Sequence, residues 1–188
     1  MRIGHLQNIY EQAATRMQSA LDKLEQKLTG AGHTVTETGD QFNFNAILGH
    51  HLNLMSYEAA EVHQAQMEQY PQYYLPNIRK LVETGLKLGP AEYLASCAYQ
   101  DELKQHSASL FEGYDLLISP ATIDEAPAPN TTGDPKFNSP WSFLGLPTLT
   151  IPMQLSDNGL PLGLQLIAPP GGEDQLLEDA QLIAKSIR

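Results

Sequence analysis

Apolar positions near the start of the chain recur with the periods of one helix and two short strands. Between residues 9 and 29 they are spaced by four and three, which places them on one helix face: Ala13, Met17, Leu21, Leu24 and Leu28. The β-branched run 33–38 predicts a strand, and residues 2–6 predict another. Strand, helix and strand in succession favour a parallel pair.

The middle of the chain shows only helical periodicity. The pattern predicts helices over 43–70, 76–88 and about 91–112, separated at Pro71 and Gly89. In the first of these helices one apolar stripe keeps the helical period: Leu48, Leu52, Met55, Ala59 and Val62. In the second helix the predicted inward residues are Ile78, Leu81, Val82 and Leu86.

After Gly113 the pattern changes to strands and loops. Residues 115–119 form a compact apolar run that predicts a buried strand. The next segment, 120–140, contains five prolines and predicts a long loop, and loops of this length inside a domain are often functional. A short helical turn is predicted over 141–144, closed by Gly145.

The last part of the chain predicts a hairpin and a helix. Residues 148–155 and 162–167 read as strands, and Asp157-Asn158-Gly159 between them is a strong turn signal because Asn and Gly tolerate a positive φ. Residues 174–187 then carry a helical apolar stripe. Together these elements predict an α/β fold with a mixed β-sheet flanked by helices.

Composition narrows the classes of protein and partner. The 188 residues include 11 basic and 22 acidic side chains, a net charge of −11, which disfavours nucleic acid as a partner. No apolar run approaches the roughly 18 residues of a membrane span, so no membrane partner is expected. The single cysteine, Cys97, allows no internal disulfide, which fits a cytoplasmic protein.

Few residues suggest catalysis by themselves. The chain has no Gly-x-Ser-x-Gly turn and no two adjacent serines, so nothing singles out a Ser-His-Asp triad. Cys97 lies in a predicted helix among small residues, which favours a buried structural thiol over a nucleophile. A new enzyme activity, with His106 or Cys97 in the active site, stays an alternative that only an activity screen could support.

Metal and cofactor sites are not predicted. His50 and His51 are neighbours and diverge by about 100° around a helix, so they do not form a zinc-type pair. His63 is the third histidine of this helix. His51 and Glu58 share a helix face, yet polar residues on such a face are usually solvated. Gly171-Gly172 lacks the spaced glycines and the lysine of a phosphate-binding loop.

An ordered series of motifs carries a family resemblance. It comprises Tyr114–Thr122, Thr132–Pro135, Phe137–Pro147 and Gly159–Ile167. In order and spacing this series resembles the C-terminal part of the amidase signature family. The helix-rich part, 1–113, is similar to the central region of that family, so the resemblance covers the whole chain.

The resemblance implies an activity, and it also identifies the catalytic residues that this sequence lacks. Members hydrolyse or transfer amide groups with a lysine and two serines, which lie in an N-terminal half that contains a stretch like Gly-Gly-Ser-Ser-Gly-Gly. This sequence has no such stretch, and none of its lysines lies in a matching context, so no catalytic residue is assigned. The resemblance implies only candidate substrate-pocket walls: Phe137, Asn138 and Trp141. For Trp141, a place in the core is an equal alternative.

Two hypotheses follow from this resemblance. In the first, residues 1–188 are the C-terminal portion of an amidase-like domain, helix-rich over 1–113 and strand-rich with a final helix over 114–188, and inactive alone. In the second, the chain is a non-catalytic binding or assembly module that completes a separately encoded N-terminal amidase half. In both, an uncovered sheet edge favours pairing with that half or self-association. A small amide is expected as substrate only after completion.

Overall fold

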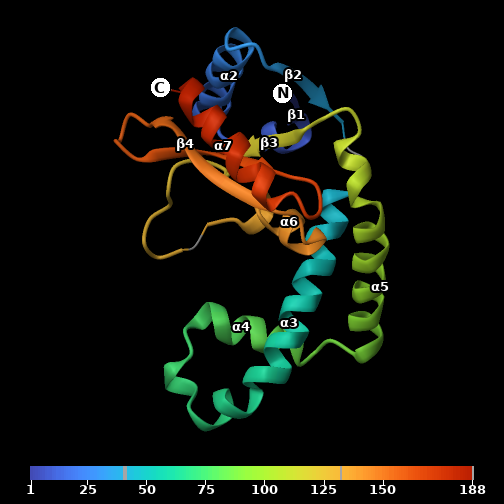
Figure 1. Cartoon of the computed structure of the whole chain (residues 1–188). Helices are drawn as coiled ribbons and strands as arrows, with labels where there is room; N and C mark the ends of the chain where they lie inside the picture. Colours follow the sequence, from blue (N-terminus) through green and yellow to red (C-terminus); the bar gives the residue numbers. More distant parts are fainter. Residues whose placement is uncertain (40–41, 132, 188) are drawn as a thin grey trace. The chain divides into compact units, whose positions relative to one another are not determined.

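A computed structural model describes residues 1–39, 42–131 and 133–187 (Figure 1). The chain separates into two units, one formed by residues 1–42 and 106–188 and the other by residues 43–105. The first unit contains β1 (Arg2–Leu6), α1 (Gln7–Tyr10), α2 (Thr15–Gly30), β2 (Thr34–Thr38), η2 (Ser107–Phe111), β3 (Leu116–Pro120), η3 (Pro135–Phe137), α6 (Ser139–Leu144), β4 (Thr148–Leu155), β5 (Pro161–Ile167) and α7 (Glu173–Ile187). The second contains α3 (Phe44–Gln69), η1 (Pro71–Tyr73), α4 (Pro76–Gly85) and α5 (Pro90–His106).

The first unit is built on a mixed five-stranded sheet with the strand order β2-β1-β3-β5-β4. β1 pairs in parallel with both β2 and β3, whereas β5 pairs antiparallel with β3 and with β4. The predicted parallel pair and the predicted hairpin are both confirmed. Gly159 closes the hairpin at a φ of +77°, a conformation that glycine adopts without strain.

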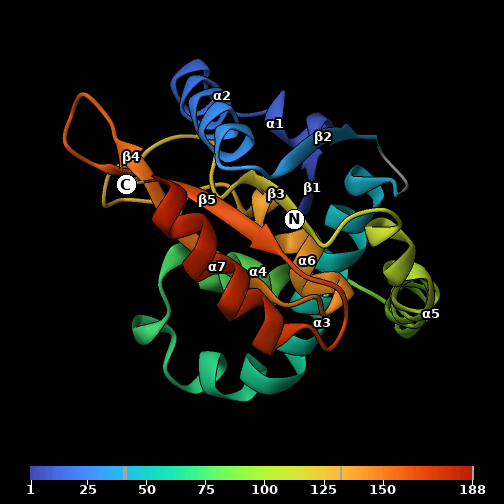
Figure 2. The ribbon, with the colours of Figure 1, turned by 45° about the horizontal axis from the view of Figure 1, so that its top comes forward.

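The core of this unit lies on both faces of its central strands. Every residue of β3 is buried, as are the last four residues of β5, which explains why these strands read as continuous apolar runs. α2 and α7 lie side by side over one face of the sheet (Figures 1 and 2). The predicted stripe of α2 is buried against this sheet as expected.

The first helical region differs from its predicted bounds. The sequence pattern predicts one helix over 9–29, but the structure has the short α1 followed by a turn, and α2 begins only at Thr15. Ala14, the residue before α2, has extended backbone, and its N–H donates to the carbonyl of Ile123 at 2.7 Å. This long-range hydrogen bond keeps Ala14 out of the helix, and no local periodicity could reveal it.

The second unit consists of helices in which the apolar period does not by itself mark the buried face. In α3 the buried residues are Phe44, Ile47, Leu54, Ser56 and Ala60. Leu52, Met55 and Val62 of the apolar stripe are exposed instead. The reason is the close approach of α4: a Cβ built on Gly85 would lie 1.8 Å from the carbonyl oxygen of Ser56. The small residues Ser56 and Ala60 therefore lie on the face of α3 that α4 covers.

The prediction of the inward residues of α4 is only partly right. Val82 is fully buried, whereas Ile78 and Leu86 are exposed. Gly85 packs inward in their place, because its missing side chain permits the close contact with α3. The change of composition at residue 113 does not coincide with the boundary between the units, since β1 and β2 share one sheet with β3, β4 and β5. Within the described residues, no helix is both long and apolar enough to cross a membrane.

Candidate functional site

The parallel strands of the first unit end beside the long proline-rich loop. β3 ends at Pro120, and among the described residues 121–131 and 133–134 no helix or strand intervenes before η3 begins at Pro135. In open α/β sheets, ligands usually bind beyond the carboxyl ends of the strands, where such loops emerge. This end of β3 is therefore the first place to look for a functional site.

Three side chains form a hydrogen-bonded relay beside this loop. The indole Nε1–H of Trp141 donates to Gln165 Oε1 at 3.1 Å, and Gln165 Nε2–H donates to Asn138 Oδ1 at 2.9 Å. The Asn138 Nδ2–H in turn donates to the carbonyl oxygen of Ala121 at 3.4 Å, at the beginning of the loop. The relay thus connects α6, β5 and the loop.

The structure places the three predicted pocket-wall residues differently. Phe137 and Trp141 are almost completely buried, with exposed fractions of 0% and 1%. Asn138, between η3 and α6, is exposed. Of the three, Asn138 is therefore the residue that can meet a small molecule from solvent in this structure. The pocket-wall role of all three stays a prediction.

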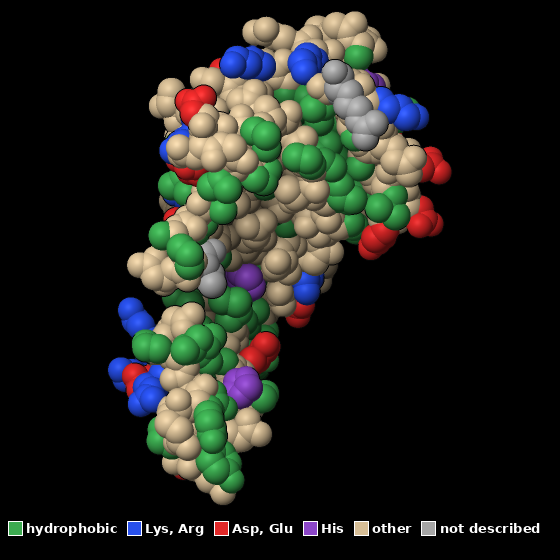
Figure 3. All heavy atoms as spheres, turned by 90° about the vertical axis from the view of Figure 1, so that its left-hand side faces the viewer, with side chains coloured by type: hydrophobic (Ala, Val, Ile, Leu, Met, Phe, Trp, Pro, Cys, Tyr) green, Lys and Arg blue, Asp and Glu red, His purple; other side chains and the backbone are tan. Residues whose placement is uncertain are grey.

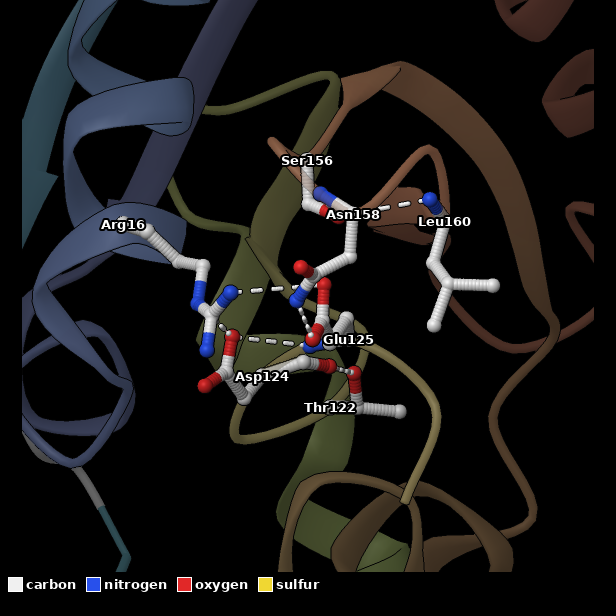
Figure 4. Close-up of polar contacts among 7 residues, drawn as sticks. All are labelled: Arg16, Thr122, Asp124, Glu125, Ser156, Asn158 and Leu160. Carbon is white, nitrogen blue, oxygen red and sulfur yellow. Dashed lines mark hydrogen bonds and ion pairs between the residues drawn. The ribbon is translucent and has the colours of Figure 1, made fainter. Parts of the chain in front are cut away.

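A second polar cluster holds the first part of the same loop, at Asp124 and Glu125 (Figure 4). Arg16 at the start of α2 pairs with Asp124 through Nε at 2.7 Å and with Glu125 through Nη1 at 3.3 Å. Asn158 in the β4–β5 turn donates from Nδ2 to Glu125 Oε1 at 2.6 Å. This cluster ties the loop to both α2 and the hairpin, so it restricts where the loop can move.

Electrostatics in this cluster favour the ionised carboxylate. Hydrogen bonds from Ser156 and Asn158, together with the charge of Arg16, hold the pKa of Glu125 below its usual range, against an opposing effect of desolvation. A carboxylate that stays charged and accepts several hydrogen bonds is suited to anchoring a loop. It is poorly suited to donating a proton, so we assign Glu125 a structural role.

A buried histidine, His5, lies in β1 and contacts α2. His5 is 3% exposed, and its Nδ1 lies 2.5 Å from Glu25 Oε1 of α2. The ring of Tyr10 packs edge-on against His5, and the Tyr10 hydroxyl donates to Asp22 at 2.8 Å. Desolvation and this hydrogen bond raise the pKa of Tyr10 to about 12. Both pairs join α2 to β1 and its following turn, which explains them as packing contacts.

The second unit contains several candidates named from sequence, among them His50 and Cys97. Ser96 is fully buried and receives contacts from His50 Nδ1 at 3.0 Å and Asn53 Nδ2 at 3.4 Å, while its hydroxyl donates to the Glu92 carbonyl. This geometry joins α3 to α5 and leaves the hydroxyl inaccessible.

Cys97 is half-buried on α5. Hydrogen bonds that Tyr93 makes with Cys97 and Glu58 raise the pKa of Tyr93 to about 12. Among residues 1–39, 42–131 and 133–187, no three His, Cys, Asp or Glu side chains are arranged to hold a metal ion.

Comparison with known proteins identifies the family. The model of the family described as Amidase matches residues 1–177. The chain belongs to the amidase family. Its fold agrees with this assignment: a crystal structure of an amidase matches 94% of the chain with a TM-score of 0.84, at 24% sequence identity. That match covers 43% of the solved amidase, so the mixed sheet and its helices form only part of the amidase fold.

Similar curated proteins include subunits of glutamyl-tRNA(Gln) amidotransferases. The matching subunit of this amidotransferase in Halothermothrix orenii is 30% identical over 104 residues, covering 52% of this chain and 22% of that protein. The corresponding protein from a Nostoc species is 35% identical, covering 51% of this chain and 21% of that protein. The chain thus spans about a fifth of the length of these curated relatives.

Two residues of the candidate site were missed by sequence reasoning. Gln165 is a lone amide within the otherwise apolar or small strand β5, and a polar residue in a buried strand is a signal that its side chain has a fixed partner. Arg16 carries no comparable signal, because an arginine in the first turn of an amphipathic helix is ordinary. Its partners lie more than a hundred residues away in the chain.

Proposed function

We propose that this chain is the C-terminal part of an amidase that hydrolyses carbon–nitrogen bonds other than peptide bonds, and that it is inactive alone. The observation that carries the proposal is that an amidase fold accounts for nearly the whole chain while the chain accounts for less than half of that fold. The lack of adjacent serines in its sequence supports the proposal that the chain is inactive alone. Catalysis then requires a segment with those serines, called here the catalytic segment.

The substrate-binding part of the proposal concerns the carboxyl end of β3. Asn138 offers an exposed amide group there, and Phe137 and Trp141 supply the apolar packing behind it. An amide side chain can both donate to and accept from the amide group of a small substrate. In this proposal, Asn138, Phe137 and Trp141 form one wall of the pocket, and the catalytic segment supplies the nucleophile.

The outer edge of β4 is the proposed joining surface. β4 is the last strand of the described sheet, and its eight residues include no charged side chain. Natural edge strands usually carry charges or prolines that prevent pairing. In β4 only Pro152 and the register shift that follows it interrupt the edge, which leaves Thr148–Ile151 open to a further strand. We propose that the catalytic segment pairs there.

The opposite edge of the sheet, formed by β2, is less suited to pairing than the β4 edge. β2 is three residues shorter than β4 and carries the exposed Glu37. A charged side chain on a short strand discourages pairing with another strand. A second copy of the chain is the competing occupant of the β4 edge. The cytoplasm is the proposed location, because a chain with one cysteine needs no oxidising compartment.

The experiment separates a C-terminal part from an independent enzyme. The purified chain is incubated with a simple carboxamide and with an acyl-anilide, and release of ammonia or aniline is followed. The same assay is repeated after co-expression with an amidase segment from the same genome that contains adjacent serines. We expect hydrolysis only in the second case, together with co-purification of the two chains.

Two other outcomes would argue against the proposal. Hydrolysis by the isolated chain that disappears on changing Cys97 or His106 to Ala would show an independent enzyme. Co-purification without hydrolysis, from a catalytic segment that keeps its serines, would favour the assembly module instead. Replacement of Thr150 by Lys in β4 should weaken co-purification, whereas Thr36→Lys in β2 is the matched control and should not.

A further inference from the structure

Gln165 is a buried amide in the middle of the sheet. It lies in β5, is 3% exposed, and is followed by the buried residues Leu166 and Ile167. A buried amide is costly unless both of its ends form hydrogen bonds. Here both ends do: the oxygen accepts from Trp141, and the nitrogen donates to Asn138. The burial of Gln165 is therefore compatible with a stable core.

The indole determines the direction of the whole relay. A tryptophan Nε1–H can only donate, so the oxygen of the Gln165 amide must face Trp141. The nitrogen of Gln165 then faces Asn138, which obliges the Asn138 oxygen to accept and turns its nitrogen toward the Ala121 carbonyl. One donor thereby orients two successive amide groups.

Asn138 retains bonding capacity after these contacts. One of its two N–H groups donates to Ala121, and one lone pair of its oxygen accepts from Gln165. The side chain is exposed, and the described residues provide no other hydrogen bond to it. The second N–H and the second lone pair are therefore available to a ligand, in an orientation that the relay sets.

We propose that Gln165 is a positioning residue that holds the Asn138 amide in one orientation for pairing with the amide group of the substrate. The inference rests on the proposed function, because it assumes that the substrate binds at the carboxyl end of β3. Gln165 does not reach solvent itself and acts only through Asn138. Trp141 contributes the N–H that selects between the two possible orientations.

The isolated chain tests the orientation. Gln165→Glu keeps an oxygen for the Trp141 N–H but removes the donor to Asn138, so the two facing oxygens repel and the Asn138 amide turns over. Gln165→Met removes both hydrogen bonds at similar volume. We expect the Asn138 side-chain ¹⁵N–¹H resonances to shift in both variants and in Trp141→Phe. Gln154→Met, on the exposed part of β4, is the control and should leave them unchanged.

The assembled enzyme tests the consequence. Because misplacement of a binding group by about 1 Å can cost a hundredfold, we expect Gln165→Met to lower kcat/KM roughly 10- to 100-fold. Asn138→Ala should have a similar effect. The double variant should have the same kcat/KM as Asn138→Ala alone, because without the Asn138 amide Gln165 has no group to orient.

Each alternative result has a definite meaning. Unchanged Asn138 resonances in Gln165→Met would overturn the positioning role directly. Losses of kcat/KM that multiply in the double variant would also overturn it, because Gln165 would then act independently of Asn138. An assembled wild-type enzyme without activity would overturn the proposed function, and with it the role of Asn138 toward substrate.

Discussion

The two units of this chain differ in how they use apolar side chains. The first unit buries its aromatic residues Phe137, Trp141 and Phe143 together with the aliphatic residues of β3 and β5. In the helices of the second unit, the buried set is small and partly polar: Phe44, Ile47, Leu54, Ser56, Ala60, Val82, Gly85, Ser96 and Leu103. Of the fourteen exposed large apolar side chains in the described residues, nine lie in residues 43–105.

This difference shows where each unit obtains its stability. Burial of large side chains on two faces of a sheet stabilises the first unit strongly. The second unit exposes apolar side chains at its surface (Figure 3) and depends on close helix contacts at small residues. We therefore expect the second unit to open at a lower free energy than the first. The following substitutions test this comparison, beginning with the largest expected effect.

Phe137→Ala should destabilise the first unit most. Its ring is fully buried, and removal of a buried aromatic side chain typically costs about 3–5 kcal/mol. Trp141 is the only tryptophan, so its fluorescence during urea unfolding reports on this unit. The control is Leu155→Ala, whose side chain is 64% exposed and whose loss should change the free energy of unfolding by less than about 0.5 kcal/mol. A cost below about 1 kcal/mol for Phe137→Ala would instead favour a pocket wall over a core residue.

Gly85→Ala should destabilise the second unit selectively. The added Cβ would overlap the Ser56 carbonyl, so α3 and α4 must separate, at a cost of about 1–3 kcal/mol. Hydrogen exchange should then accelerate in α3 and α4 while the sheet amides remain protected. Gly49→Ala is the matched control: its Cβ meets no atom within 4 Å, and it should stabilise α3 by up to about 1 kcal/mol. Equal acceleration in both units would contradict their independence.

Ser96→Ala should have a smaller effect in the same unit. The hydroxyl joins His50 and Asn53 of α3 to α5, and loss of such hydrogen bonds costs about 1 kcal/mol. Hydrogen exchange of α5 amides should increase accordingly. If stability did not change, water would have replaced the hydroxyl as the partner of His50 and Asn53. The contact between α3 and α5 would then depend on apolar packing alone.

Asp115→Asn should have the smallest effect, and one that depends on pH. The backbone N–H and the guanidinium of Arg2 hold the pKa of Asp115 below its usual value. A lowered folded-state pKa contributes stability above the unfolded pKa, near 4, and this contribution is lost as pH falls through the folded pKa. Since both side chains are more than one-third exposed, we expect less than about 1 kcal/mol at pH 7. Urea midpoints of the variant and the wild type should differ at pH 7 and approach each other as the pH falls below the unfolded pKa toward the lowered folded pKa, and a constant difference would refute the ionic origin.

Local patterns were most informative where the chain packs in a regular way. The five strands, the hairpin turn at Asn158-Gly159 and the last helix all follow from alternation, period and turn residues. The inward face of α3 did not follow, because its apolar stripe is not the face that approaches α4. A stripe of large side chains predicts burial only when no small residue permits a closer contact.

The candidate site was predictable only in part. The motif resemblance selected Asn138 and Trp141, and the structure joins them through Gln165, which no motif singled out. Gln165 lies 24 residues after Trp141 and 27 residues after Asn138, so no local pattern predicts these hydrogen bonds. A glutamine in a buried strand indicated only that some partner exists. The cluster around Arg16 could not be predicted, because its members come from three distant segments.

The sequence alone determined most of the elements, the parallel pair of β1 and β2, the hairpin of β4 and β5, and the family resemblance, because periodicity, turn chemistry and motif order are local properties. Only the tertiary structure decided the strand order, the covered face of each helix and the orientation of the Asn138 amide. These depend on which distant groups meet: a glycine against a carbonyl in one unit, and a donor-only indole against an amide in the other.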